Sequence, residues 1–261
     1  MSAGTFTPRP GAAPLPRMIA AQAALETRML LRNGEQLLLT AVIPTLLLVL
    51  FSAVDIIDVP VDTAGGQGGR VDFLAPGILA LAVLSTAFTG QAISTGFERR
   101  YGVLKRLGAS PLPRWGLMTA KTCAVLVIEV LQLVLLTVVA LALGWSPHGN
   151  PLSVLLLLLL GTAAFSGLGL LMAGTLKAEA TLAAANLVFI LLLVAGGIIV
   201  PLEKFPGAVQ GVLQLLPVSA LSDGLRDVLQ HGSGTPWADL GVLAVWAVLG
   251  LGAAARFFKW E

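Results

Sequence analysis

The chain has 261 residues, of which 56% are hydrophobic and 11% charged, with a formal net charge of +2 at pH 7 and a mean hydropathy of +0.90. Apolar runs of about twenty residues recur along it, which excludes a soluble globular protein and predicts an all-α protein with several membrane-spanning helices. The basic residues lie between these runs, where they report topology, so the positive charge gives no support for nucleic-acid binding.

The N-terminal segment is rich in proline and carries two arginines, a composition typical of a disordered tail rather than a cleavable signal peptide. We expect residues 1–17 to form a disordered cytosolic tail. Residues 18–34 then predict an interfacial helix at the membrane surface, because Gln22 and Glu26 share one line at helical spacing.

The remainder, within a transmembrane domain over residues 18–261, contains six apolar segments that can each cross a hydrocarbon core of about 30 Å. They cover roughly residues 36–54, 73–95, 115–144, 152–175, 181–200 and 237–256. The stretch 201–235 is also apolar, but Pro206, Pro217 and Gly224 divide it into short pieces. Such pieces predict short interfacial or re-entrant helices on the outer side, before the sixth span.

Basic residues divide unevenly between the two sets of connecting segments. Thirteen of the sixteen lie on the side that holds the N-terminus: Arg9, Arg17, Arg28, Arg32, Arg99, Arg100, Lys105, Arg106, Arg114, Lys121, Lys177, Arg256 and Lys259. Only Arg70, Lys204 and Arg226 lie on the other side. The positive-inside rule therefore predicts a multi-pass protein of the cell membrane with both termini in the cytosol.

The longest basic segment is FERRYGVLKRLGASPLPR, residues 97–114. Read as one helix, it places Phe97, Tyr101 and Leu104 on a single apolar stripe with charges beside it, and the SPLP sequence then ends the helix. An anchor touching anionic lipid would explain the charges. A helix with an apolar ridge can also fill a groove on another protein, which would explain the stripe as well.

The run ERRYGVLKRLGASPLPRW, which follows a span opening with FLAPGILAL, resembles the permease subunits of ABC-2 type exporters, particularly the daunorubicin-resistance permeases. The likeness extends over nearly the whole chain: a surface helix, six spans, a basic helix after the second span and short outer helices before the sixth. It implies an ATP-driven efflux system of the cell membrane that exports a hydrophobic or amphiphilic substrate, such as a drug, an antibiotic or a lipid-like molecule.

The resemblance also identifies the basic helix as the coupling helix that docks on an ATPase subunit. The docking residues it implies are Glu98, Arg99, Arg100, Tyr101, Leu104, Lys105, Arg106 and Leu107. The sequence contains no GxxxxGK[ST] phosphate-binding loop, so we expect no enzymatic activity and no cofactor in this chain, with ATP and Mg²⁺ bound by a separate ABC ATPase. A second permease chain, identical or related, and membrane lipids are the other expected partners.

Glu129 stands near the middle of the third predicted span, where an ionised carboxylate costs about 2.5–3.5 kcal/mol. Thr122 and Gln132 share approximately its face. Two interpretations remain open: a polar strip along a substrate path, or helix packing through a protonated or hydrogen-bonded Glu129. The glycines of the fourth span, including Gly161, Gly167 and Gly169, predict close helix packing.

Other classes of protein fit the sequence less well. Cys123, His148 and His231 have no metal-ligand or catalytic company, so neither a metal site nor a membrane enzyme is expected. The alternative function is a secondary transporter or channel driven by an ion gradient. Such proteins often carry charges in several spans, whereas only Glu129 is clearly intramembrane in this sequence.

Overall fold

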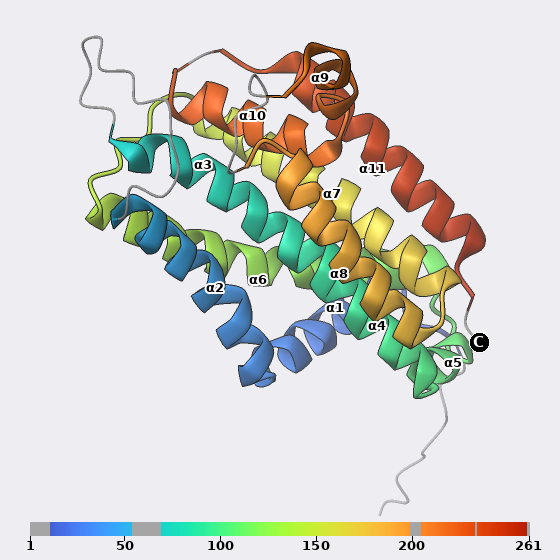
Figure 1. Ribbon diagram of the computed structural model, residues 1–261. Helices are drawn as coiled ribbons and strands as arrows, with labels where there is room; N and C mark the ends of the chain where they lie inside the picture. Colours follow the sequence, from blue (N-terminus) through green and yellow to red (C-terminus); the bar gives the residue numbers. More distant parts are fainter. Residues whose placement is uncertain (1–10, 54–68, 199–204, 233, 260–261) are drawn as a thin grey trace, which may run out of the picture.

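The computed structural model describes residues 11–53, 69–198, 205–232 and 234–259, and every regular element in these ranges is a helix (Figure 1). The predicted all-α class is therefore confirmed. Within the same ranges, five helices are long and apolar enough to cross a membrane: Arg70–Arg100, Arg114–Ala142, Pro151–Thr175, Ala178–Ala195 and Trp237–Phe257. These correspond to the second to sixth predicted spans.

A continuous rod of 31 residues forms the middle of the bundle (Figure 1). It consists of α3 (Arg70–Val83), the π-helical turn η1 (Leu84–Gly90) and α4 (Gln91–Arg100). Nearly all of α3 is buried, because helices pack around it on several sides. A π-turn widens the helix by one residue and often marks a functional position, so η1 is a candidate position for a functional site.

Two of the surrounding helices, α7 (Pro151–Thr175) and α11 (Trp237–Phe257), pack closely along their length. Gly167 and Gly250 face each other at this contact, and a Cβ on Gly167 would lie 2.5 Å from the backbone nitrogen of Leu251. The absence of side chains lets the two backbones approach, which confirms the packing role predicted for the glycines of this span.

The N-terminal helix α1 (Leu15–Arg32) precedes α2 (Gly34–Ala53), and α1 packs against the beginning of α6 (Arg114–Ala142). The helix begins three residues before the expected start, because a proline fits the first turn of a helix without loss of a hydrogen bond. Residues 1–10 of the predicted tail lie outside the described part of the chain. The apolar part of α2, Thr40–Ala53, is shorter than the five long helices.

Two short helices, α9 (Gly207–Leu213) and α10 (Pro217–Leu229), lie before α11 at the end of the bundle opposite α5 (Figure 1). Most of α10 is buried against α3 and α7. Its Arg226 guanidinium lies 4.2 Å from the centre of the Phe73 ring and donates a 2.8 Å hydrogen bond to the carbonyl of Ile198. These contacts fix α10 to the central rod.

The basic segment is not the single helix that the sequence predicted. The chain leaves α4 at Arg100, turns at Gly102 with a φ of 73°, and begins a separate helix, α5 (Val103–Gly108). A left-handed φ is easy for glycine and costly for other residues, so the break lies where the sequence allows it. The stripe expected from Phe97 through Tyr101 to Leu104 is therefore wrong at Leu104, because it assumed unbroken helical spacing. The Phe97 and Tyr101 rings do stack, with their centres 6.2 Å apart.

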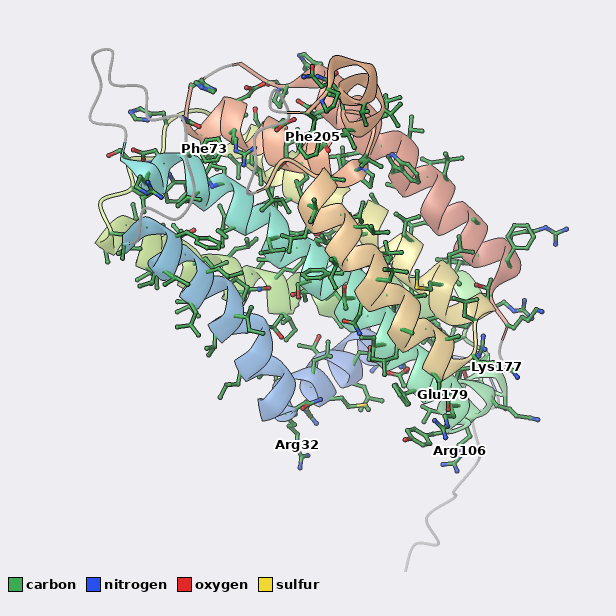
Figure 2. The ribbon with its side chains drawn as sticks, viewed as in Figure 1. Arg32, Phe73, Arg106, Lys177, Glu179 and Phe205 are labelled. Carbon is green, nitrogen blue, oxygen red and sulfur yellow. The ribbon has the colours of Figure 1, made fainter. Side chains whose placement is uncertain are left out.

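Side chains at the surface follow the membrane pattern. Large apolar side chains are exposed along α2, α6, α11 and the helix α8 (Ala178–Ala195), where lipid would cover them. Charged side chains gather at the ends instead, and Figure 2 shows Arg32, Arg106 and Lys177 at the end that holds α5, opposite Phe73 and Phe205. The bundle thus has one strongly basic end.

The α7–α11 contact gives a test of the fold. Replacing Gly167 with Ala places a methyl group against the α11 backbone and should lower the melting temperature of the purified protein. Gly252→Ala is the matched control, because a Cβ at Gly252 meets nothing within 4 Å. Since alanine favours helix over glycine by about 0.5–1 kcal/mol, the control should melt at an equal or higher temperature. Equal melting of the two variants would contradict the close contact.

Candidate functional site

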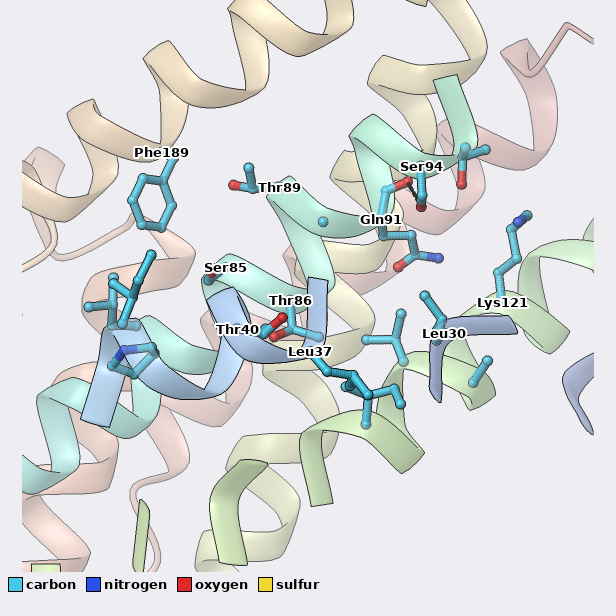
Figure 3. Close-up of a pocket in the computed structure, with 18 of the residues that line it drawn as sticks. Leu30, Leu37, Thr40, Ser85, Thr86, Thr89, Gln91, Ser94, Lys121 and Phe189 are labelled. Atoms are coloured by element: carbon cyan, nitrogen blue, oxygen red, sulfur yellow. Dashed lines mark hydrogen bonds between the residues drawn. The ribbon is translucent and has the colours of Figure 1, made fainter. Parts of the chain in front are cut away.

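A cavity of about 500 Å³ lies beside η1, and its walls come from α1, α2, α3, η1, α4, α6 and α8 (Figure 3). This volume is within the range of small-molecule binding sites in proteins. The cavity has three parts: a polar wall on η1 and α4, an apolar wall on α2 and α8, and a charged end formed by side chains from α1, α4 and α6.

The polar wall follows from the π-turn and the first turns of α4. Its hydroxyl and amide side chains are those of Ser85, Thr86, Thr89, Gln91, Ser94 and Thr95. Gln91 is only 4% exposed, yet neither atom of its side-chain amide has a hydrogen-bond partner among the described residues. The Oγ1 atoms of Thr89 and Thr95 are also buried and have no hydrogen-bond partner among the described residues. Buried polar atoms normally find partners, so this wall offers unused donors and acceptors.

The opposite wall is apolar. Leu37, Ile43 and Leu47 of α2 and Phe189 and Leu193 of α8 line this part of the cavity. Figure 3 shows Phe189 projecting from α8 on one side, with Leu37 on the other side of the polar wall. The space is therefore amphipathic, with hydrogen-bonding groups along one wall and hydrocarbon along the other.

The charged end contains a cluster of three ionisable side chains, which we call the Lys121 cluster. The Nζ atom of Lys121 donates hydrogen bonds to Oε2 of Glu98 at 2.6 Å and to Oε2 of Glu26 at 3.1 Å. Gln22 holds Glu26 by a further 2.8 Å hydrogen bond to Oε1. Lys121 and Glu26 are buried, and Glu98 is mostly so. A buried ammonium needs such partners, and here they join three different helices.

The residues predicted for a substrate path lie elsewhere. None of Thr122, Glu129 and Gln132 is among the residues that line this cavity. Thr162 of α7 donates a 2.5 Å hydrogen bond to Oε2 of Glu129, an arrangement that joins α6 to α7. The geometry thus favours the packing interpretation of Glu129.

Gln132 acts from behind the cavity wall. Its Oε1 accepts a 2.8 Å hydrogen bond from Thr86, and its Nε2 donates a 2.7 Å hydrogen bond to the carbonyl of Thr40. Both threonines line the cavity. Gln132 therefore ties η1 to α2 and positions two lining residues without lining the cavity itself.

The predicted docking residues divide into buried and exposed groups. Leu104 is fully buried in a small cluster, which we call the inner-end core and which contains Leu104, Leu112, Leu117, Met118, Leu170, Ala254 and Phe258. Glu98 belongs to the Lys121 cluster and Leu107 packs against the inner-end core. The exposed members are Arg100, Tyr101, Lys105 and Arg106. The expected ridge of Tyr101 and Leu104 is therefore wrong, because the turn at Gly102 directs Leu104 inward.

Two arginines tie the end of α4 to the neighbouring helices. Arg99 donates a 2.5 Å hydrogen bond to the carbonyl of Leu176, at the end of α7. Arg100 forms an ion pair with Glu179 in the first turn of α8. The region around Tyr101 is thus attached to α7 and α8 as well as to the inner-end core.

Sequence reasoning missed the Lys121 cluster. Lys121 counted only as an indicator of topology and Glu26 only as part of a surface helix. A lysine seven residues into an apolar helix was the available signal, because a charge at that depth needs a buried partner.

Comparison with known proteins gives two findings. The sequence pattern of the ABC-2 family transporter proteins matches residues 15–256. A curated protein of Bacillus subtilis (strain 168), named "Putative transport permease YvfS", is 25% identical over 231 residues, which cover 87% of this chain and 91% of that protein.

The Lys121 cluster gives a test by charge. Lys121→Met leaves the Glu26 and Glu98 carboxylates buried together without their cation and should destabilise the protein by about 3–5 kcal/mol. Glu26→Gln leaves one carboxylate for the lysine and should cost clearly less. Thermal unfolding of the purified variants measures the difference. If both variants melt at the same temperature, the three side chains do not act as one ionic cluster.

Proposed function

The chain belongs to the ABC-2 family of transporter proteins and is a multi-pass membrane protein, and from this premise we propose that it is the permease subunit of an ATP-driven exporter. The family implies a partnership with an ABC ATPase. The observation that carries the proposal is the exposed helix α5 at the basic end of the bundle, fixed to the transmembrane helices by the inner-end core.

In the proposed topology, α2 is the first of six spans and the basic end of the bundle is cytosolic. The positive-inside rule supports this orientation, because the connections at that end carry Arg32, Arg106 and Lys177. Both termini then lie in the cytosol of a cell-membrane protein. In this arrangement α1 is the interfacial helix, and α9 and α10 are the short outer helices before the sixth span.

The proposed docking surface is the exposed part of the α4–α5 turn. Tyr101 is 68% exposed, and Val103 and Arg106 are exposed beside it. Tyrosine and arginine are the residues that most often dominate binding energy at interfaces. Movement of an ATPase bound there would displace α5, and Leu104 would transmit the displacement to α6, α7 and the C-terminal segment through the inner-end core.

The proposed substrate path includes the cavity between α2 and α8. Its apolar and polar walls suit a hydrophobic or amphiphilic molecule, such as a drug, an antibiotic or a lipid-like compound. Gln132 supports the polar wall through its hydrogen bond with Thr86, whereas we assign Glu129 to helix packing. We propose that two permease chains, identical or related, work with two ATPase chains among membrane lipids, and that ATP and Mg²⁺ bind only to the ATPase.

An ion-gradient-driven transporter is the alternative function. The observation that favours it is the presence of buried carboxylates at Glu129 and in the Lys121 cluster, since such groups can carry protons or cations in secondary transporters. The ion pairs to Lys121 explain Glu26 and Glu98 as structural groups, and Thr162 holds Oε2 of Glu129, whose Oε1 has no hydrogen-bond partner among the described residues.

The docking surface gives a direct test. A Tyr101→Ala, Arg106→Gln variant loses two exposed side chains and no core contact, so it should insert and melt normally. It should bind its ATPase about tenfold more weakly, since interface anchors of these types are worth roughly 1–2 kcal/mol or more. The measurement is co-purification of the ATPase with the membrane-inserted permease.

Two further variants separate docking from stability. Trp237→Ala removes an exposed aromatic ring at the start of α11. The opposite end of α11 is the one near α5, so this variant should leave ATPase binding unchanged. Leu104→Ala opens the inner-end core and should lower the melting temperature, as large-to-small core substitutions cost about 2–5 kcal/mol. Retention of the ATPase at the parental level by the Tyr101 and Arg106 variant would contradict the docking assignment.

A further inference from the structure

We propose that the cavity binds an amphiphile with a single positively charged amine head, whose head lies at the Lys121 cluster and whose apolar body lies along α2 and α8. This inference rests on the proposed function, because it names the chemical class of the molecule that the permease would carry. Three independent features of the cavity support it: its charge, its unused polar atoms and its apolar wall.

The charge of the cavity is negative at one end. Among the described residues that line it, the charged side chains are Glu26, Glu98 and Lys121, so two carboxylates face one ammonium. When both carboxylates are ionised, the three side chains carry a formal charge of −1 beside apolar walls, where charges interact more strongly than in water. A cationic head would balance this charge, and an anionic head would be repelled.

The unused polar atoms lie on the helix that supplies Glu98. Gln91 and Thr95 precede it on α4, and both are at least nine-tenths buried. The carbonyl oxygen of the Gln91 amide and the Oγ1 atom of Thr95 have no partner among the described residues. Figure 3 shows Gln91 extending from α4 into the space toward Leu30 and Leu37. An ammonium group donates several hydrogen bonds and accepts none, so it matches these two acceptors and Glu98.

The apolar wall determines the rest of the ligand. Ile43, Leu47, Leu81, Val125, Phe189 and Leu193 continue the cavity away from the charged end. A ligand with charge at one end and hydrocarbon along the remainder would fill both parts. An uncharged lipid tail would fill only the apolar part and would leave two carboxylates sharing the single cation of Lys121.

The experiment measures binding to the permease alone. The purified permease is placed in nanodiscs of phosphatidylcholine, which has no net charge, and titrated with a fluorescent alkylamine that carries one primary ammonium. The matched probe is its N-acetyl derivative, which keeps the tail and lacks the charge. Protein-free nanodiscs correct for partition into lipid. We expect the amine to bind at least about tenfold more tightly than the acetylated probe.

Three variants locate the head. Glu98→Gln removes the excess charge while Lys121 keeps Glu26, so the preference for the amine should fall about tenfold and binding of the acetylated probe should not change. Gln91→Leu removes an unpartnered amide, so it should fold normally and weaken the amine about threefold. Glu179→Gln, a carboxylate on α8 outside the cavity lining, is the matched control and should affect neither probe.

Equal affinity of the two probes, or no binding of either, would overturn the inference, and so would an unchanged preference in both Glu98→Gln and Gln91→Leu. Because the assay contains no ATPase and no transport step, its failure leaves the proposed ATPase partnership standing. Conversely, specific amine binding by a permease that fails to retain an ATPase would overturn the proposed function and keep the ligand site.

Discussion

The ammonium of Lys121, held between the carboxylates of Glu26 and Glu98, is the interaction on which the inner half of the structure depends. Three buried charges in this position are costly to remove from water, and they are tolerated because each has a partner within hydrogen-bonding distance. The partners come from α1, α4 and α6, so the cluster fixes the N-terminal helix to two membrane helices. It also forms one end of the cavity.

The central rod determines what lies on either side of that cluster. The buried polar side chains of the π-turn and of the first turns of α4 lie away from the protein surface. Thr86 is hydrogen-bonded to Gln132, whereas Gln91 and Thr95 line the cavity. Close backbone contact between α7 and α11 at Gly167 completes the wall behind the rod. Leu104 joins α5 to the inner-end core, which contains residues of α6, α7 and α11.

Sequence reasoning predicted the long apolar helices well, because hydrocarbon thickness imposes a length that can be read directly from the residues. It failed at Gly102, where one residue with φ of 73° divides the predicted helix and turns Leu104 inward. It also missed the Lys121 cluster, since partners 23 and 95 residues away in the chain have no local signal. For Glu129 the inward direction could be predicted, but Thr162 as its donor depends on how α6 and α7 pack.

In the proposed function, this permease moves its substrate only when a separate ATPase acts on it. The most direct measurement is transport of a fluorescent amphiphile in sealed proteoliposomes that contain the permease alone or together with its ATPase. We expect transport to require both proteins and hydrolysable ATP, and an imposed proton or sodium gradient to be unable to replace them. Transport by the permease alone, driven by such a gradient, would contradict it.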